Sequence, residues 1–251
     1  MLKQFNLFIL LIACVAISAP MALANSVCPG NPSIETEIGP DKKYKFAKSY
    51  TYTMSVADAA GEQQNVDLEL LVPNKDEPKY IAIRINDQGF DGHIVFDHEL
   101  DAMVMLMKDK TGTMMTFDML KQFNPMTQGQ ATTEVSDVTM EKTGKNGTHM
   151  GYNYEEVAIK STDGEGVVWM SSDKSFNLFK LFEDFGGMGG QSTMMSQDQF
   201  KEMEGLLLKA VMKDKSGQTS TMTLTDSKDL ETEINLADYQ IMDMSSMMQQ
   251  K

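Results

Sequence analysis

The sequence is poor in arginine, cysteine, histidine and tryptophan. Its single arginine is Arg84 and its formal net charge is −14, so it has no guanidinium cluster to recognise phosphate or carboxylate groups. Nucleic-acid backbones would be repelled by most of this acidic surface. The apolar content of 41% and the charged content of 23% exclude a wholly disordered chain and a membrane bundle. Composition therefore indicates a globular, acidic protein of 251 residues that does not bind nucleic acid.

The first 24 residues are predicted to be a secretory signal peptide. Lys3 supplies a positive charge, residues 5–19 are nearly all apolar, and residues 22–24 form a small-residue cleavage site. An alternative is a lipoprotein signal that would leave a lipidated Cys14. No other stretch approaches eighteen apolar residues, so the mature chain is expected to lack a transmembrane segment. We expect an exported protein of the periplasm or cell surface of a Gram-negative bacterium.

The mature chain is predicted to contain one domain between two flexible ends. Residues 25–42 are polar and hold three prolines, which predicts a flexible N-terminal arm. Residues 43–244 are predicted to form a single domain, and residues 245–251 a flexible methionine-rich tail. Cys28 is the only cysteine after the signal peptide, so the domain has no internal disulfide and depends on its core.

Apolar and polar residues alternate along most of the chain, which is the pattern of half-buried β-strands. The segment 103–107 is apolar on both faces. Asn146-Gly147 is expected to be a hairpin turn, and a change of parity predicts a bulge near residues 155–156. The predicted class is mainly β (α+β), with an antiparallel sheet. The expected strands cover residues 50–56, 66–72, 81–85, 94–96, 103–107, 113–117, 135–140, 150–159, 167–170, 206–212, 219–224 and 234–244.

Short helices are expected at three places. Residues 118–124 are predicted to form about one helical turn before a proline. Residues 176–185 carry aromatic and leucine side chains at helical spacing and are followed by a Gly-Gly stop. A capping box begins a further helix at 196–204. The helix at 176–185 is too apolar to be solvated and is expected to pack on one face of the sheet.

No residue pattern indicates catalysis. The histidines are His93, His98 and His149, and the densest group of titratable residues is 91–101. On a strand, His93 and Asp97 share a face while His98 points the other way, so both imidazoles reach one metal only if the strand bends. We interpret this segment as a solvated strand face and turn. Hydrolase, zinc-protease, phosphate-loop and EF-hand motifs are absent, and we predict no catalytic residue, metal site or cofactor.

Methionine is unusually frequent, with 23 residues. Met103, Met105 and Met107 alternate and should line one face of a strand, and a second group crowds residues 242–248. Three interpretations remain open. Thioethers are soft ligands that select Cu(I); unbranched, polarizable side chains suit a cavity for variable apolar ligands; or methionine simply fills the core in place of leucine.

The segment 138–157, VTMEKTGKNGTHMGYNYEEV, followed by Val167-Val168-Trp169, resembles an uncharacterised family of exported bacterial domains. That family is similar in turn to the LolA-like lipoprotein-carrier superfamily. The resemblance covers roughly residues 50–170. It implies a curved antiparallel sheet, an incomplete barrel lidded by short helices, with an apolar groove that holds lipids or lipoprotein acyl chains.

We therefore expect a non-enzymatic, exported envelope protein that binds an apolar ligand, a lipid or a lipoprotein acyl chain, between sheet and helices. The alternatives are a methionine-based periplasmic copper-binding protein and a structural or interaction module with a filled core. Trp169 is expected to be largely buried, sharing the core face of its strand with Val167. The expected groove-lining residues are Met103, Met105, Met107, Trp169, Phe179 and Phe182.

Overall fold

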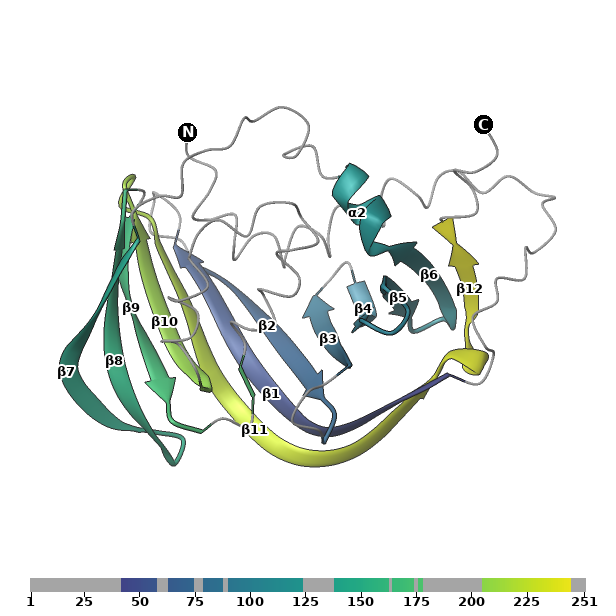
Figure 1. The fold of residues 1–251 in the computed structure, drawn as a ribbon, viewed down its shortest axis with the longest axis horizontal. Coiled ribbons are helices and arrows are strands. Elements are labelled where there is room, and N and C mark those ends of the chain that lie inside the picture. Colours follow the sequence, from purple (N-terminus) through teal and green to yellow (C-terminus); the bar gives the residue numbers. More distant parts are fainter. Residues whose placement is uncertain are drawn as a thin grey trace. The chain divides into compact units, whose positions relative to one another are not determined.

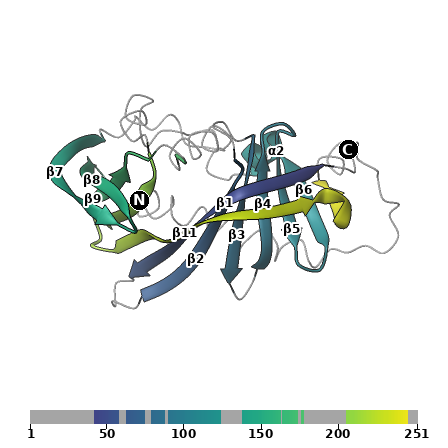
Figure 2. The same cartoon turned by 90° about the horizontal axis from the view of Figure 1, so that it is seen from below.

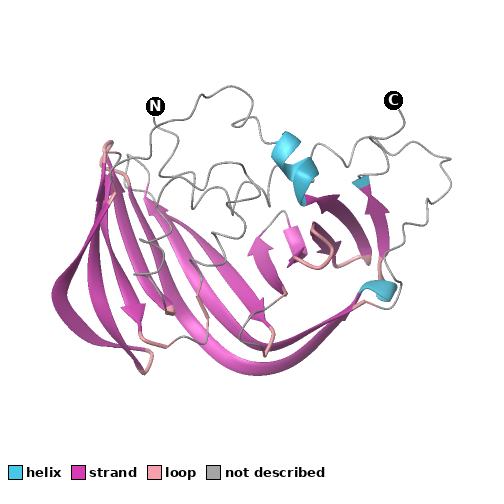
Figure 3. Ribbon diagram, in the orientation of Figure 1, coloured by secondary structure: helices cyan, strands magenta, loops and turns pink. Residues whose placement is uncertain are grey.

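A computed structural model describes residues 42–57, 63–74, 79–87, 90–123, 138–162, 164–173, 176–177 and 205–244. The described elements are strands, one short α-helix and one 3-10 helix (Figure 3). The predicted signal peptide, the tail at 245–251 and the helix at 196–204 lie outside the described residues. So do the N-terminal arm, except its last residue, and the predicted helix at 176–185, except its first two residues.

The strands alternate with short connections through most of the chain. Helix α2 (Phe117–Phe123) follows β6, and the 3-10 helix η2 (Leu236–Asp238) separates β11 from β12. The strands are β1 (Lys43–Ala57), β2 (Gln63–Val72), β3 (Tyr80–Asp87), β4 (Phe90–Asp97), β5 (Ala102–Met107), β6 (Thr111–Thr116), β7 (Thr139–His149), β8 (Tyr152–Ser161), β9 (Gly164–Ser171), β10 (Leu207–Asp214), β11 (Thr219–Asn235) and β12 (Gln240–Asp243).

All twelve strands belong to one sheet, in the order β12-β6-β5-β4-β3-β2-β1-β11-β10-β9-β8-β7 (Figure 1). The registers from β2 to β6 and from β7 to β11 are antiparallel. Strand β12 pairs with β6 in parallel. The edges β7 and β12 lie at opposite ends of this order, so the sheet is open. The mainly β class and the antiparallel sheet are confirmed.

Most strands lie where the alternation predicts them. The segment 103–107 is β5, whose side chains are buried on both faces, and the helical turn at 118–124 is α2. Strand β1 begins at Lys43, well before residue 50. Strand β11 continues to Asn235, far beyond residue 224. The alternation did not predict this extension, because the middle residues of β11 are exposed and polar and lack the pattern of a half-buried strand.

The hairpin turn predicted at Asn146-Gly147 is wrong. Both residues lie inside β7, and the chain turns at Met150 and Gly151, which have φ angles of 51° and 83°. Gly147 is required for packing, because a β-carbon there would lie 2.8 Å from the hydroxyl of Tyr154. The glycine thus marks the close approach of an aromatic ring and not a turn.

The bulge predicted near residues 155–156 lies on the partner strand. Lys142 pairs with Val157 and Asn146 pairs with Glu155, so residues 143–145 all face Glu156. The extra residues belong to β7, where Gly144 has a φ of 78°. The bulge brings the side chains of Thr143 and Lys145 onto the carboxylate of Glu156.

The chain divides into two compact units, which are described separately. Unit 1 comprises the described residues within 52–66 and 120–226, including strands β7–β10. Unit 2 comprises those within 9–51, 67–119 and 227–251, including β3–β6 and β12. Strands β1, β2 and β11 contribute residues to both units.

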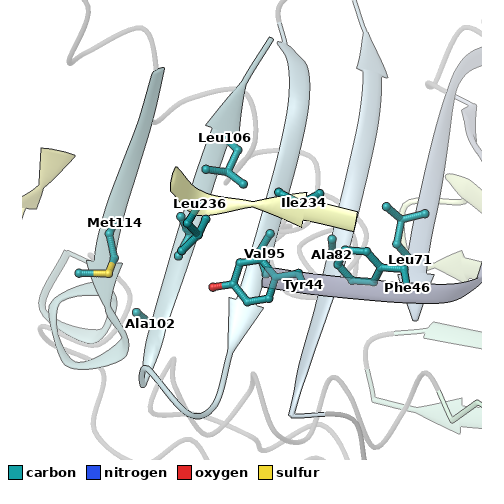
Figure 4. Packing of buried hydrophobic residues seen from close by; sticks show 11 residues of the cluster. Tyr44, Phe46, Leu71, Ala82, Val95, Ala102, Leu106, Met114, Ile234 and Leu236 are labelled. Atoms are coloured by element: carbon teal, nitrogen blue, oxygen red, sulfur yellow. The ribbon is translucent and has the colours of Figure 1, made fainter. Parts of the chain in front are cut away.

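The core of unit 2 covers one face of β2–β6. The start of β1 and the end of β11 run across these strands (Figure 2). Tyr44, Phe46 and Ile234 from the crossing segments cluster with Ala82 and Val95 from the strands beneath (Figure 4). Each large apolar side chain buried in this way contributes about 1.5–3 kcal/mol.

In unit 1 the core face of β9 differs from the prediction. Val168 and Met170 are 1% and 7% exposed, whereas Val167 and Trp169 are only half-buried. Across the register Val168 pairs with Val157 and with Ala210, which places the buried row on their face. The predicted core face of Val167 and Trp169 is wrong, because the run 167–170 is apolar at every position and alternation could not choose between the faces.

Candidate functional site

Strands β2–β6 of unit 2 are apolar on the second face as well. Register places Leu70, Ile83, Ile94 and Met105 in one row, each opposite the next. We call this second surface the isoleucine–methionine face; apart from half-buried Phe96 and Met107, its side chains are at most 7% exposed. It consists of Leu68, Leu70, Ile81, Ile83, Ile85, Ile94, Phe96, Met103, Met105, Met107 and Met115.

The three methionines singled out in the sequence all lie on this face. Met103 is fully buried, Met105 is 6% exposed, and Met107 is half-buried at the end of β5. Met103 is the direct cross-strand partner of Met115, which the sequence did not single out as a groove residue. Four methionines therefore share one apolar surface with aliphatic neighbours.

Trp169 belongs to unit 1 and is held by four neighbours. Its ring stacks on Tyr154 with centroids 4.4 Å apart and an interplanar angle of 8°. The ammonium of Lys209 lies 4.8 Å from the ring centroid, and His149 approaches edge-on at 6.2 Å. The indole N–H donates to the carboxylate of Glu156 at 3.1 Å.

The groove-lining set expected from the sequence is therefore not assembled within either unit. Its methionines lie in unit 2, and Trp169 lies in unit 1. Phe179 and Phe182 lie outside the described residues.

Glu156 connects Trp169 to the bulge of β7. Its carboxylate accepts hydrogen bonds from Lys145 at 3.0 Å and from the hydroxyl of Thr143 at 3.1 Å. Lys145 and the indole N–H of Trp169, followed by Thr143, hold the pKa of Glu156 below its usual value. The charged carboxylate thus satisfies three donors at once, which fixes the bulge and the indole together.

Asp97 contradicts the interpretation of residues 91–101 as a solvated strand face. Its side chain is 0% exposed, and its carboxylate accepts the hydroxyl proton of Tyr44 at 2.9 Å and pairs with Lys42 at 2.5 Å. Asp91, in contrast, lies at the surface and pairs with Lys108. Sequence analysis predicts no partner for Asp97, because Lys42 falls within the predicted arm and Tyr44 precedes the first expected strand.

Backbone donors complete the site around Asp97. The N–H groups of Glu99 and Leu100 donate to Oδ1 at 2.8 and 3.0 Å. Burial, and then the neighbouring Asp97 carboxylate, raise the pKa of the Tyr44 hydroxyl, which therefore remains a proton donor. All of these are structural contacts, and they tie the start of β1 to the end of β4.

His93 gives the protein a pH-dependent stability. Burial, and then the charge of Arg84, lower the pKa of His93 from 6.5. The unfolded chain therefore binds a proton that the folded chain resists, so the free energy of unfolding should fall as the pH drops below about 6.5. In urea titrations between pH 7.5 and 5, the variant His93→Gln should lose less stability than the wild type. Parallel losses in both proteins would contradict this role.

The part of the chain that the structure describes was compared with two simple patterns, a metal-ligand cluster and a membrane-spanning helix. Within it, no three or more His, Cys, Asp or Glu side chains are placed to hold a metal ion. No described helix is both long and apolar enough to cross a membrane.

Comparison with known proteins places the chain in a family. A family model matches residues 74–236, which is more than half of the sequence. The chain belongs to the family described as domain of unknown function (DUF4412). The match confirms the prediction of an uncharacterised family. No curated protein matches this DUF4412 chain.

Several solved structures are similar to the DUF4412 chain. A LolA superfamily protein from Nitrosomonas europaea is 12% identical, with a TM-score of 0.29 over 73% of this chain and 86% of that one. MucB in complex with MucA(peri) is 9% identical, with a TM-score of 0.34 over 74% and 50%. PNGF-II is 10% identical, with a TM-score of 0.38 over 81% of this chain, which spans only about a third, 32%, of PNGF-II.

Proposed function

We propose that this DUF4412 protein is a non-enzymatic, exported envelope protein that binds an apolar ligand, a lipid or a lipoprotein acyl chain, on the isoleucine–methionine face. The observation that carries the proposal is the double-sided apolar character of β2–β6. An antiparallel sheet commonly packs one face on a core and keeps the other polar. Here the core of Figure 4 uses one face, and the opposite face is equally apolar.

The side chains of this face suit an acyl chain. Isoleucine and leucine provide an apolar surface without polar donors, and methionine adapts its shape to ligands of different length. Residues 50–170 resemble an exported family that is similar in turn to LolA-like carriers, which supports the same ligand class. A copper site would need the same side chains, because the four methionines are the soft donors on this face.

Leucine substitution separates the lipid from the copper hypothesis. The triple variant Met103→Leu, Met105→Leu, Met107→Leu should keep the fold, since each exchange conserves volume and costs under about 1.5 kcal/mol. A fluorescent fatty acid titrated against both proteins should bind with affinities within about threefold of each other. Cu(I), titrated against a competing chelator, should bind neither protein tightly. Tight Cu(I) binding that the triple variant loses, without fatty-acid uptake by the wild type, would overturn the lipid proposal.

A charge on the face tests where the ligand lies. Met107 is half-buried, so Met107→Glu is expected to keep the fold while it places a carboxylate against the proposed acyl chain. It should weaken fatty-acid binding at least about tenfold. The matched control is Met212→Glu, because Met212 is a half-buried methionine of β10 in unit 1. Equal losses in both variants would place the ligand elsewhere.

A further inference from the structure

A polar recess lies at one end of unit 1, where two hairpins end side by side. Strands β9 and β10 pair antiparallel with Gly164 opposite Asp214, so the β8–β9 turn and the β10–β11 turn lie at the same end. The recess between them has a volume of about 350 Å³. It is lined by Lys160, Ser161, Thr162, Gly164, Glu165, Lys213, Asp214 and Lys215.

Both turns are fixed by their own side chains. The hydroxyl of Ser161 donates to the carbonyl of Gly164 at 3.2 Å. Asp214 Oδ1 accepts from the hydroxyl of Ser216 at 2.6 Å and from the N–H of Gln218 at 2.9 Å. A β-carbon on Gly164 would collide with the carbonyl oxygen of Lys213, so the two backbones approach as closely as glycine allows. Hydrogen bonds therefore hold the described residues of both turns in place beside the recess.

The lysines of the recess differ from nearly all other described lysines. Among the other lysines whose side chains the structure describes, the ammonium groups pair with carboxylates or lie over aromatic rings, with Lys48 the exception. Lys160, Lys213 and Lys215 are exposed and form no ion pair among the described residues. Three lysines that form no ion pair with the described carboxylates are notable in a chain whose net charge is −14.

We infer that this recess binds a phosphate ester. A phosphate dianion offers acceptor oxygens and charge for the three ammonium groups, and lysine is an established partner of phosphate. Thr162 adds a hydroxyl donor at the rim. The carboxylate of Asp214 is already hydrogen-bonded within its own turn. The carboxylate of Glu165 also lines the recess and would repel a bound phosphate. The site is in unit 1 and does not depend on the acyl-chain proposal.

The test measures binding of glycerol 3-phosphate to the mature chain by calorimetry. The variant Lys160→Gln, Lys213→Gln, Lys215→Gln should bind at least about tenfold more weakly than the wild type. The matched control is Lys43→Gln, Lys108→Gln, Lys142→Gln, which makes the same change in charge at exposed, ion-paired lysines. It should stay within about twofold of the wild type.

Two further measurements complete the test. Glu165→Gln should bind glycerol 3-phosphate more tightly, because one opposing charge is removed. Flotation with phosphatidylcholine vesicles, with and without phosphatidic acid, distinguishes the source. Association with the phosphatidic acid vesicles indicates a lipid headgroup, and binding of the free ester alone indicates a soluble phosphate. No binding of either probe by the wild type, or equal losses in both triple variants, would overturn the inference.

Discussion

The variant Asp97→Ala is expected to lower the free energy of unfolding by about 3–5 kcal/mol, which is the cost of removing one partner of a buried ion pair. The substitution leaves the buried hydroxyl of Tyr44 and two backbone N–H groups without their acceptor, and the ammonium of Lys42 keeps only its contact with Glu99 at 3.4 Å. Few domains have more than about 5–15 kcal/mol of stability in total. Urea unfolding followed by circular dichroism should therefore show a large drop in the transition midpoint.

Asp91→Ala is the matched control. It removes the same kind of side chain from the same strand, but Asp91 is exposed and its ion pair with Lys108 lies at the surface. Surface ion pairs contribute little, so the transition midpoint should change only slightly. Tyr44→Phe removes only the hydroxyl and should fall between the two, at about 1–2 kcal/mol. Equal midpoints for Asp97→Ala and Asp91→Ala would show that the contacts of Asp97 do not stabilise the fold.

Asp97 also illustrates what local patterns cannot predict. The alternation of apolar residues predicted the positions of most strands, because burial of one face imposes a period of two. It failed for an aspartate that is buried by partners more than fifty positions away, at Tyr44 and Lys42. A charged residue within a polar segment looks solvated until the fold supplies the opposite charge, and no sequence pattern carries that information.

The hairpin of β7 and β8 shows a second limit. Asn146-Gly147 has the composition of a two-residue turn, yet the tertiary packing of Tyr154 against Gly147 places both residues inside a strand. The parity change at Glu155 and Glu156 predicted a bulge in this hairpin. A change of parity does not reveal which of two paired strands holds the extra residues. In this hairpin the contact between Gly147 and Tyr154 outweighs the turn preference of Asn146-Gly147.

The candidate site was predicted in part. The shared face of Met103, Met105 and Met107 follows from strand periodicity alone. The participation of Met115 and of the isoleucines required the register of the sheet, which alternation does not specify. The recess at the hairpin ends was missed, because its three lysines come from two hairpins and form no cluster in the sequence.

The variant Trp169→Ala is expected to lower the free energy of unfolding by about 3 kcal/mol, at the lower end of the range for buried aromatic residues, because the indole is half-buried. The stack on Tyr154 and the ammonium of Lys209 each add about 0.5–1.5 kcal/mol beyond area burial. Loss of the indole also removes one donor from Glu156. The measurement is urea unfolding followed by circular dichroism.

Two variants divide this effect into its parts. Trp169→Phe keeps an aromatic ring for Tyr154 and Lys209 but has no N–H, so it should recover more than half of the lost stability. Val167→Ala truncates another half-buried side chain on the same face of β9 and should cost no more than about 1 kcal/mol. If Val167→Ala and Trp169→Ala were equally destabilising, general burial on β9 would account for the loss. A larger effect at Trp169 that phenylalanine largely restores would instead assign the stability to the ring contacts with Tyr154 and Lys209, because only those contacts survive the exchange.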